Sequence, residues 1–189
     1  MIIKTYIDSF QPSKRQELKD AIATIKNRMS LKRFAPIYIT NHLISRKQVY
    51  RFHKTFDCFV STTRGEGWGV PQMEAMLLGK PIISTNIGGI HEHLEDGTNA
   101  YLIPHTLIPL RANSRNQQWY LPDQNWADID GEKLRAALRF VFKNQDKAKE
   151  LGALSKALVL QKFSLPAVGQ LMKDRLEKIV PLDNHNTIT

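Results

Sequence analysis

The sequence is poor in cysteine and contains no long hydrophobic run. Cys58 is the single cysteine of the 189 residues, so no disulfide can form within the chain, and we expect a reducing, cytoplasmic location. No apolar segment approaches the roughly 18 residues that a membrane-spanning helix needs. The first residues lack the basic stretch and apolar segment of a secretory signal, so we expect no signal peptide. These absences argue against disulfide-stabilised and transmembrane proteins.

The overall composition is that of an ordinary globular protein. Hydrophobic residues make up 42% and charged residues 24% of the chain, which argues against disordered and fibrous classes. A length of 189 residues favours one domain over two full-size ones.

Positive charge is concentrated at the front of the chain. The net charge is +9, and residues 1–55 carry 12 Lys and Arg against 3 Asp and Glu, whereas the remainder carries 15 of each. A basic front can face nucleic acid, an anionic membrane surface or an anionic small ligand, or it can simply be a solvated helix face. The sequence has no RNA-recognition or helix-turn-helix signature, so a nucleic-acid partner ranks last and is not expected.

Strand-like and helix-like segments alternate over most of the sequence. Short β-branched or apolar runs predict strands at 2–7, 36–40, 58–61, 81–84 and 101–103. Helical periodicity and capping signals predict helices at 14–29, 45–54, 70–79, 91–94, 130–143, 146–162 and 165–179. This order predicts an α/β fold: one doubly wound Rossmann-like domain, with a parallel sheet of about five strands, helices on both faces and a helical C-terminus.

Two segments interrupt this pattern. Residues 104–128 contain three prolines without clear periodicity, and we interpret them as an irregular insertion in a domain that covers 1–180. The polar residues 181–189 are expected to form a loose tail. Doubly wound folds bind ligands beyond the carboxyl ends of their strands, so the candidate ligand loops are 41–44, 62–69 and 86–89.

A glycine-rich stretch between a predicted strand and a predicted helix carries the chemistry. Gly65, Gly67 and Gly69 surround Glu66 and Trp68, and glycine allows a ligand to approach the backbone closely. The helix that opens at Val70 directs free N–H groups and partial positive charge outward, which suits a phosphate. Glu66 and Glu74, eight positions apart, could accept sugar or ribose hydroxyls from the same cleft. For these residues alone, a capping turn with two solvated glutamates is the simpler interpretation.

The longer run containing this turn resembles a known signature. Residues 66–83 read EGWGVPQMEAMLLGKPII, followed by Gly88-Gly89, Glu92 and Asp96-Gly97. This order is similar to the E-x7-E pattern of the large group-1 family of retaining GT-B glycosyltransferases, whose usual form has Phe and Leu where this chain has Trp68 and Val70. The resemblance covers about residues 36–104 well and the flanking helices loosely.

The resemblance implies one half of a GT-B fold that binds a nucleotide-diphosphate sugar, UDP- or GDP-linked, without a metal or other cofactor. Carried over, Glu66 would be the catalytic residue that contacts the donor sugar. Gly67, Trp68, Gly69 and Val70 would bind the donor sugar and diphosphate, and Glu74 the ribose. The loop with His42, Leu43 and Ile44 would lie beside the nucleobase.

The resemblance also implies that an acceptor-binding domain, N-terminal to this segment or on a partner chain, is missing, together with the basic pair that grips the diphosphate. We therefore expect a hexosyl-type glycosyltransferase domain, inactive in isolation, and cytoplasmic with peripheral membrane contact as an open possibility. The alternatives are a non-catalytic nucleotide-sugar-binding or regulatory module and a basic nucleic-acid-binding protein.

Four further residues have simpler explanations. Cys58, in an apolar strand, is expected to be a small core residue and not a nucleophile. His91 and His93 flank Glu92 without enough neighbours for a metal site, so we expect solvated or capping histidines. Arg64 is a conceivable phosphate contact, but a structural or solvent-facing role is the simpler expectation.

Overall fold

The computed structural model describes residues 1–5, 12–29, 33–110, 121 and 123–179. Whereas the sequence predicts one domain over 1–180, the chain divides into two compact units, Met1–Phe56 and Asp57–Thr189. The strands explain the division, since within the described residues those of the first unit pair only with each other. The predicted tail 181–189 lies outside the described residues.

The first unit contains a parallel strand pair and two helices. Strand β1 (Ile2–Lys4) pairs in parallel with β2 (Tyr38–Thr40), with Ile3 opposite Ile39. Helix α1 (Pro12–Arg28) lies between them in the chain, as a parallel connection requires. Helix α2 (Arg46–Lys54) begins at a capping box: the Gln48 N–H donates to Ser45 Oγ at 3.4 Å, and the Ser45 N–H donates to Gln48 Oε1 at 2.7 Å.

The second unit is built on a three-stranded parallel sheet. Strands β3 (Phe59–Ser61), β4 (Ile82–Thr85) and β5 (Tyr101–Ile103) lie in this order, with β4 in the centre. All four residues of β4 are buried, as expected for a strand covered on both faces.

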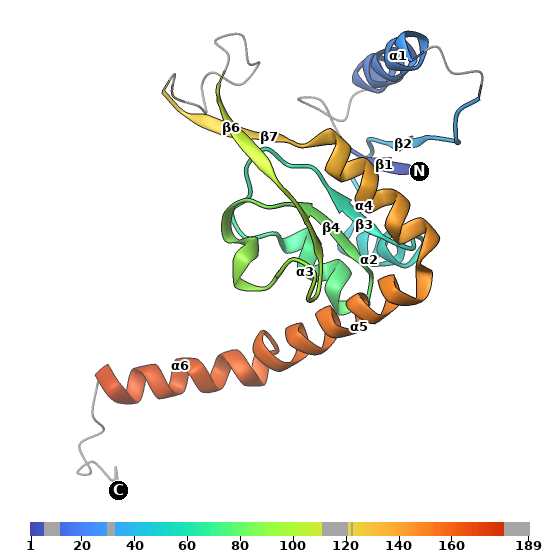
Figure 1. The fold of residues 1–189 in the computed structure, drawn as a ribbon. Coiled ribbons are helices and arrows are strands. Elements are labelled where there is room, and N and C mark those ends of the chain that lie inside the picture. The colour runs from blue at the N-terminus through green and yellow to red at the C-terminus, as the bar shows by residue number, and fades with distance from the viewer. Residues whose placement is uncertain (6–11, 30–32, 111–120, 122, 180–189) are drawn as a thin grey trace, which may run out of the picture. The chain divides into compact units, whose positions relative to one another are not determined.

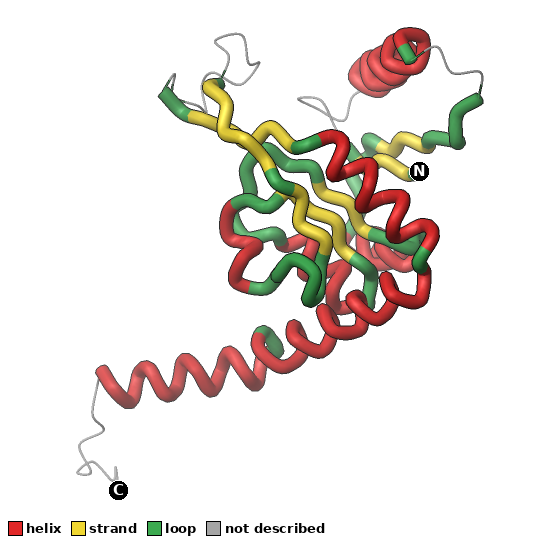
Figure 2. Tube along the Cα trace, in the orientation of Figure 1, coloured by secondary structure: helices red, strands yellow, loops and turns green. Residues whose placement is uncertain are grey.

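Helices cover both faces of this sheet (Figure 2). Side chains alternate along a strand, so Ile82 and Leu102 pack with helix α3 (Val70–Leu77) and helix α5 (Gln145–Lys162). Ile83 and Ile103 face the other way and pack with helix α4 (Gly131–Lys143) and the start of α5. The predicted α/β fold, with parallel strands between helical layers, is confirmed.

The segment predicted to be an irregular insertion is regular at both ends, so that prediction is wrong there. Strands β6 (His105–Pro109) and β7 (Asn125–Ile129) form an antiparallel pair. The prolines that argued against a strand stand at its edges, with Pro104 before β6 and Pro109 as its last residue, where a missing N–H costs little. Residues 111–120 and 122 lie outside the described residues.

Two helical segments complete the second unit. A short 3₁₀ helix, η1 (Gly88–Glu92), begins three residues before the predicted helix at 91–94. Helix α6 (Leu165–Ile179) follows α5 in the chain (Figure 1). It has no buried residue. None of the helices in the described ranges combines the length and hydrophobicity needed to cross a bilayer.

Candidate functional site

The glycine turn lies where β3 leads into α3. Gly69 stands at the N-cap of α3 with φ of 82°, a left-handed conformation that favours glycine. Pro71 follows in the first turn of the helix, where its missing N–H costs little. The predicted strand, glycine turn and helix are therefore all present in that order.

The Glu66 carboxylate is fixed by the start of the following helix. Its Oε1 accepts a hydrogen bond from the Gly69 N–H at 3.0 Å, and its Oε2 accepts one from Gln72 Nε2 at 3.3 Å. The Gln72 side chain is only 1% exposed, so this contact is buried on one side. Glu66 is thus oriented and not freely solvated. Gln72 could not be predicted from the sequence, because nothing in the motif distinguishes it from a helix surface residue.

Gly88 and Gly89 pack directly against the backbone of the turn. Gly88 has φ of 77°, and a methyl group placed on it would overlap the Glu66 carbonyl oxygen. A methyl group on Gly89 would likewise overlap the Gly67 carbonyl oxygen, and the Gly89 N–H donates to the Glu66 carbonyl oxygen at 3.4 Å. This contact between two backbones explains why two consecutive glycines stand here.

Trp68 is partly exposed at 40% and belongs to a small group of rings. Its ring centroid lies 5.5 Å from that of His93 and 5.9 Å from that of Phe163, which follows α5. The Trp68 Nε1–H donates to Met73 Sδ at 2.8 Å. Val70, two residues after Trp68 in the sequence, is 55% exposed.

The expectation of solvated or capping histidines holds for exposed His91 but is wrong for His93. His91 Nε2 lies 2.5 Å from Asn86 Oδ1 at the surface. His93 is 2% exposed, because its ring fills the space beside Trp68 and Phe163. Burial lowers the pKa of His93, while the carboxylates of Glu66 and Glu92 act in the opposite direction.

Glu74 lies in the second turn of α3 and is half-buried. Within the described residues it makes no hydrogen bond with Glu66. The predicted roles of Glu66 as catalytic residue, Gly67, Trp68, Gly69 and Val70 as sugar and diphosphate ligands, and Glu74 as ribose ligand stay predictions.

The predicted nucleobase loop belongs to the first unit. It follows β2 and begins at Asn41, which is 1% exposed. His42 Nε2 lies 3.5 Å from Arg15 Nη1, Leu43 is 80% exposed and Ile44 is partly buried. The role of His42, Leu43 and Ile44 beside a base stays a prediction.

Arg64 joins the glycine turn to the β6–β7 pair. Its Nη2 lies 3.0 Å from Asp128 Oδ1, and its guanidinium lies 4.6 Å from the ring centroid of Trp126. Its carbonyl oxygen accepts a hydrogen bond from the Ala127 N–H at 2.8 Å. Arg64 therefore has the structural role that was its simpler explanation.

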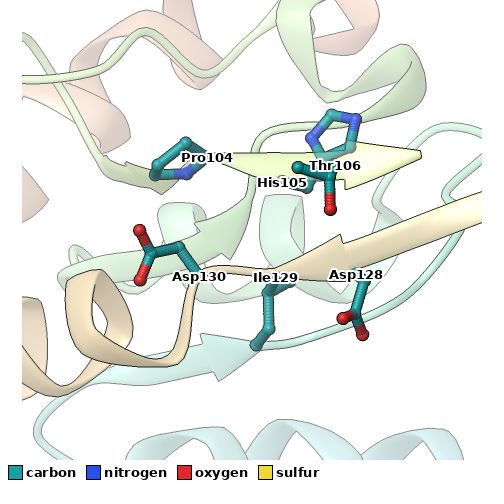
Figure 3. A pocket seen from close by; sticks show the side chains of 6 residues that line it. All are labelled: Pro104, His105, Thr106, Asp128, Ile129 and Asp130. Carbon is teal, nitrogen blue, oxygen red and sulfur yellow. The ribbon is translucent and has the colours of Figure 1, made fainter. Parts of the chain in front are cut away.

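A hollow of about 290 Å³ lies at the start of β6 and the end of β7 (Figure 3). Asp128 and Asp130 both line it, but Asp128 is paired with Arg64, and Asp130 accepts the N–H groups of Glu132 and Lys133 at the start of α4. Both acidic groups are occupied by the fold, so this hollow is a weaker candidate than the glycine turn.

The remaining reactive groups of the described residues form no metal site and no second nucleophile. In the part of the chain that the structure describes, no group of three or more His, Cys, Asp or Glu is placed to hold a metal ion. Burial, with a smaller contribution from Asp57, raises the pKa of the Cys58 thiol to about 12, which makes it a poor nucleophile.

Comparisons with known proteins identify a family from the sequence and a fold from the structure. The family described as Glycosyl transferases group 1 matches residues 8–109. A glycosyltransferase from Rickettsia africae is similar in structure, with a TM-score of 0.65 and 19% identity, over 97% of this chain and 40% of that one. HepE from Anabaena, in a complex with UDP-glucose, gives a TM-score of 0.58 and 19% identity, over 86% of this chain and 37% of that one.

A third structure is itself a domain. The C-terminal domain of the group 1 glycosyltransferase LpcC from Francisella tularensis gives a TM-score of 0.55 and 17% identity, over 82% of this chain and 66% of that one. No curated protein matches the chain. The chain spans only 37–38% of the length of the HepE structures. Its fold is that of one Rossmann-like half of a GT-B enzyme, and the family match over more than half of its residues shows that the chain belongs to the group 1 glycosyltransferases.

Proposed function

We propose that the glycine turn and the start of α3 bind a nucleotide-diphosphate sugar, from which a hexosyl group is transferred with retention of configuration. The observation that carries this proposal is the orientation of Glu66. Its two carboxylate oxygens are held by Gly69 and Gln72, so the side chain stays beside the helix start where an anionic ligand would bind. A carboxylate fixed in this way can accept sugar hydroxyls without first being ordered.

The start of α3 supplies the complementary positive potential. The first N–H groups of a helix have no partner within it and carry partial positive charge. Gly67, Trp68, Gly69 and Val70 lead into this helix end, so their backbone would lie along the diphosphate. We assign the ribose hydroxyls to Glu74 and the base to the loop of His42, Leu43 and Ile44, and we expect no metal requirement. That HepE was crystallised with UDP-glucose supports a UDP-sugar as the first probe.

The acceptor is proposed to be held by residues outside this chain, in the same protein or in a partner. HepE and the glycosyltransferase from Rickettsia africae are both much longer than the segment that matches this chain. Their extra length supports an acceptor-binding part outside this chain. The isolated chain is then a donor-binding half that transfers little sugar by itself. The basic first unit, with its excess of Lys and Arg, is available for an anionic membrane surface.

Calorimetry with UDP-glucose, GDP-mannose and ADP-glucose tests the proposal. We expect one of the three to bind, and Glu74→Ala to weaken that binding about tenfold or more, because hydrogen bonds to a charged group are lost. The exposed Glu95, in the same unit, provides the control Glu95→Ala, which should bind like the parent chain. Equal affinities of Glu74→Ala and Glu95→Ala would contradict the ribose assignment.

Glu66→Gln separates binding from chemistry. The amide keeps an oxygen that can accept the Gly69 N–H, so the turn should stay in place and donor affinity should change by less than about threefold. Sugar transfer, measured after the acceptor-binding part is supplied, should fall far more. If none of the three nucleotide sugars binds and the chain instead binds nucleic acid in a salt-sensitive way, the proposed function is wrong.

A further inference from the structure

His93 is one buried polar side chain, among those of the described residues, that the proposed donor site does not explain. It is 2% exposed, and neither Nδ1 nor Nε2 has a hydrogen-bond partner among the described residues. Buried polar groups are almost always paired, since an unpaired one loses its hydration without compensation. A leucine or phenylalanine would fill the same space without this cost, so the imidazole calls for an explanation other than packing.

The backbone of His93 is firmly fixed. Its N–H donates to the Ile90 carbonyl oxygen at 3.0 Å, and its carbonyl oxygen accepts from Asn99 Nδ2 at 2.9 Å. The Asn99 side chain is itself 2% exposed. The main chain that carries the imidazole is therefore anchored by one backbone and one buried side-chain hydrogen bond.

The ring of His93 lies behind the glycine turn. It is tilted against Trp68, with centroids 5.5 Å apart at 45°, and meets Phe163 edge-on at 6.1 Å and 84°. Trp68 and Phe163 contact each other as well, at 5.9 Å, so the three rings form one group. Trp68 is the member of this group that belongs to the turn, and His93 supports it from the buried side.

Two charged groups act on the imidazole. Glu66 belongs to the glycine turn and Glu92 to η1, and both carboxylates favour a protonated ring. Trp68 and Phe163, from the turn and from the end of α5, present uncharged rings. Burial opposes the two carboxylates and outweighs them, so the pKa of His93 lies below its usual value and the ring is neutral near pH 7.

We propose that His93 is a positioning residue for Trp68 and Glu66 in the donor turn, and that it performs this role only as a neutral imidazole. A protonated ring would be a buried cation with no hydrogen-bond acceptor at either nitrogen among the described residues. It would also attract the Glu66 carboxylate, which is now held by Gly69 and Gln72. The ligand of this turn is the nucleotide sugar of the proposed function, and to that extent the inference rests on it.

The sign of the pH dependence follows from the lowered pKa. In the unfolded chain an ordinary histidine titrates near 6.5. Above that pH the ring is neutral in both the folded and the unfolded chain, so its titration does not change folding stability. As the pH falls below about 6.5, the unfolded chain takes up the proton more readily, so folding stability is lost until the folded-state pKa is reached. Donor affinity, which depends on the folded ring alone, should fall only as the pH reaches the folded-state pKa and the ring of the folded chain takes up its proton.

Thermal unfolding of the full 189-residue chain between pH 7.5 and 5.0 tests the linkage without any ligand. We compare the parent chain with His93→Leu, His93→Gln and the control His91→Gln, which changes the exposed histidine of the 3₁₀ helix that ends just before His93. The Tm of the parent and of His91→Gln should fall by a few degrees more than that of the His93 variants. Parallel Tm profiles for all four chains would overturn the proposal.

An NMR titration of the imidazole signals in the parent chain decides the question even if both His93 variants fail to fold. The His93 ring should titrate below 6.5, and the indole signal of Trp68 should shift in the same pH interval. A His93 ring that titrates at or above 6.5, or a Trp68 signal that does not follow it, would overturn the proposal.

Calorimetry with the nucleotide sugar that binds at pH 7.5 completes the test. Its affinity in the parent chain should fall at least threefold between pH 7.5 and a pH below the His93 midpoint that the NMR titration gives, and change less in His93→Gln. An equal fall in both chains would overturn the role of His93 in the turn. If no nucleotide sugar binds at pH 7.5, the proposed function fails, whereas the Tm profiles and the NMR titration still decide whether neutral His93 supports the turn.

Discussion

At the scale of single residues, the contact of Gly88 and Gly89 with the glycine turn determines what the site tolerates. Gly89→Ala would place a methyl group on the Gly67 carbonyl oxygen, and a backbone atom cannot move aside as a flexible side chain can. Overpacking of this kind costs about 1–3 kcal/mol, so the Tm should fall by several degrees. Donor binding should fall as well, because the turn must shift.

Gly131→Ala is the matched control, measured by the same thermal unfolding. A methyl group at Gly131 meets nothing within 4 Å, and the residue lies at the start of α4. Alanine favours helices over glycine, so the Tm should stay equal or rise slightly. A Gly89→Ala chain as stable as Gly131→Ala would show that the turn and η1 are not in tight contact.

The residues of the site were predictable to different extents. The glycine turn and its neighbours in sequence form a local pattern, so Glu66, Gly69 and Pro71 could be placed from the sequence. Gln72 and His93 could not, because their roles depend on partners that only the folded chain brings near. Phe163 is the clearest case, since it reaches Trp68 from the far end of α5.

At the scale of the elements, Asp128 and Asp130 near the end of β7 should contribute differently to the free energy of unfolding, because their partners differ (Figure 3). Asp130 is the N-cap of α4 and accepts the N–H groups of Glu132 at 2.9 Å and Lys133 at 3.0 Å. Asp130→Ala should therefore lower the free energy of unfolding by about 1 kcal/mol. Urea unfolding at pH 7 measures this loss.

Asp128 provides the comparison for the same urea experiment. Its ion pair with Arg64 is about half exposed on both sides, so Asp128→Ala should cost less than about 1 kcal/mol, and less still at high salt. A larger loss for Asp128→Ala than for Asp130→Ala would mean that the link between the turn and β7 carries more stability than an exposed ion pair supplies.

Helices and caps were easier to predict than strand pairing. The predicted bounds of the last three helices lie within one residue of the observed ones at every end, because their periodicity and their capping residues are neighbours in sequence. The division into two units and the β6–β7 pair were missed. Both depend on which distant strands meet, and prolines at the strand edges concealed the alternation in β6.

At the scale of the whole molecule, the second unit combines a well-packed core with a helix that adds little to it. Helix α6 has no buried residue, and its apolar side chains are strongly exposed, with Leu165 at 90% and Leu171 at 64%. A chain that ends at Ser164 should therefore keep its Tm within about 3 °C and should bind less of a hydrophobic dye.

A shorter truncation provides the contrast. A chain that ends at Lys156 also loses Val159, which is 3% exposed, and Phe163, which packs on the same core. Burial of such side chains contributes about 1.5–3 kcal/mol each, so this chain should melt far earlier or fail to fold. If the chain that ends at Ser164 melts as early as the chain that ends at Lys156, α6 is not dispensable to the core.

The close contact between η1 and the glycine turn means that the glycines on its two sides differ in which substitutions they tolerate. Gly65 and Gly67 have open space where a side chain would begin, whereas Gly88 and Gly89 have none. A directed-evolution library that seeks new ligand preferences can therefore place its diversity at 65 and 67, next to the oriented carboxylate, while 88 and 89 are left untouched. Side chains can thus be introduced at 65 and 67 to change ligand preference, whereas at 88 and 89 they would collide with the backbone of the turn.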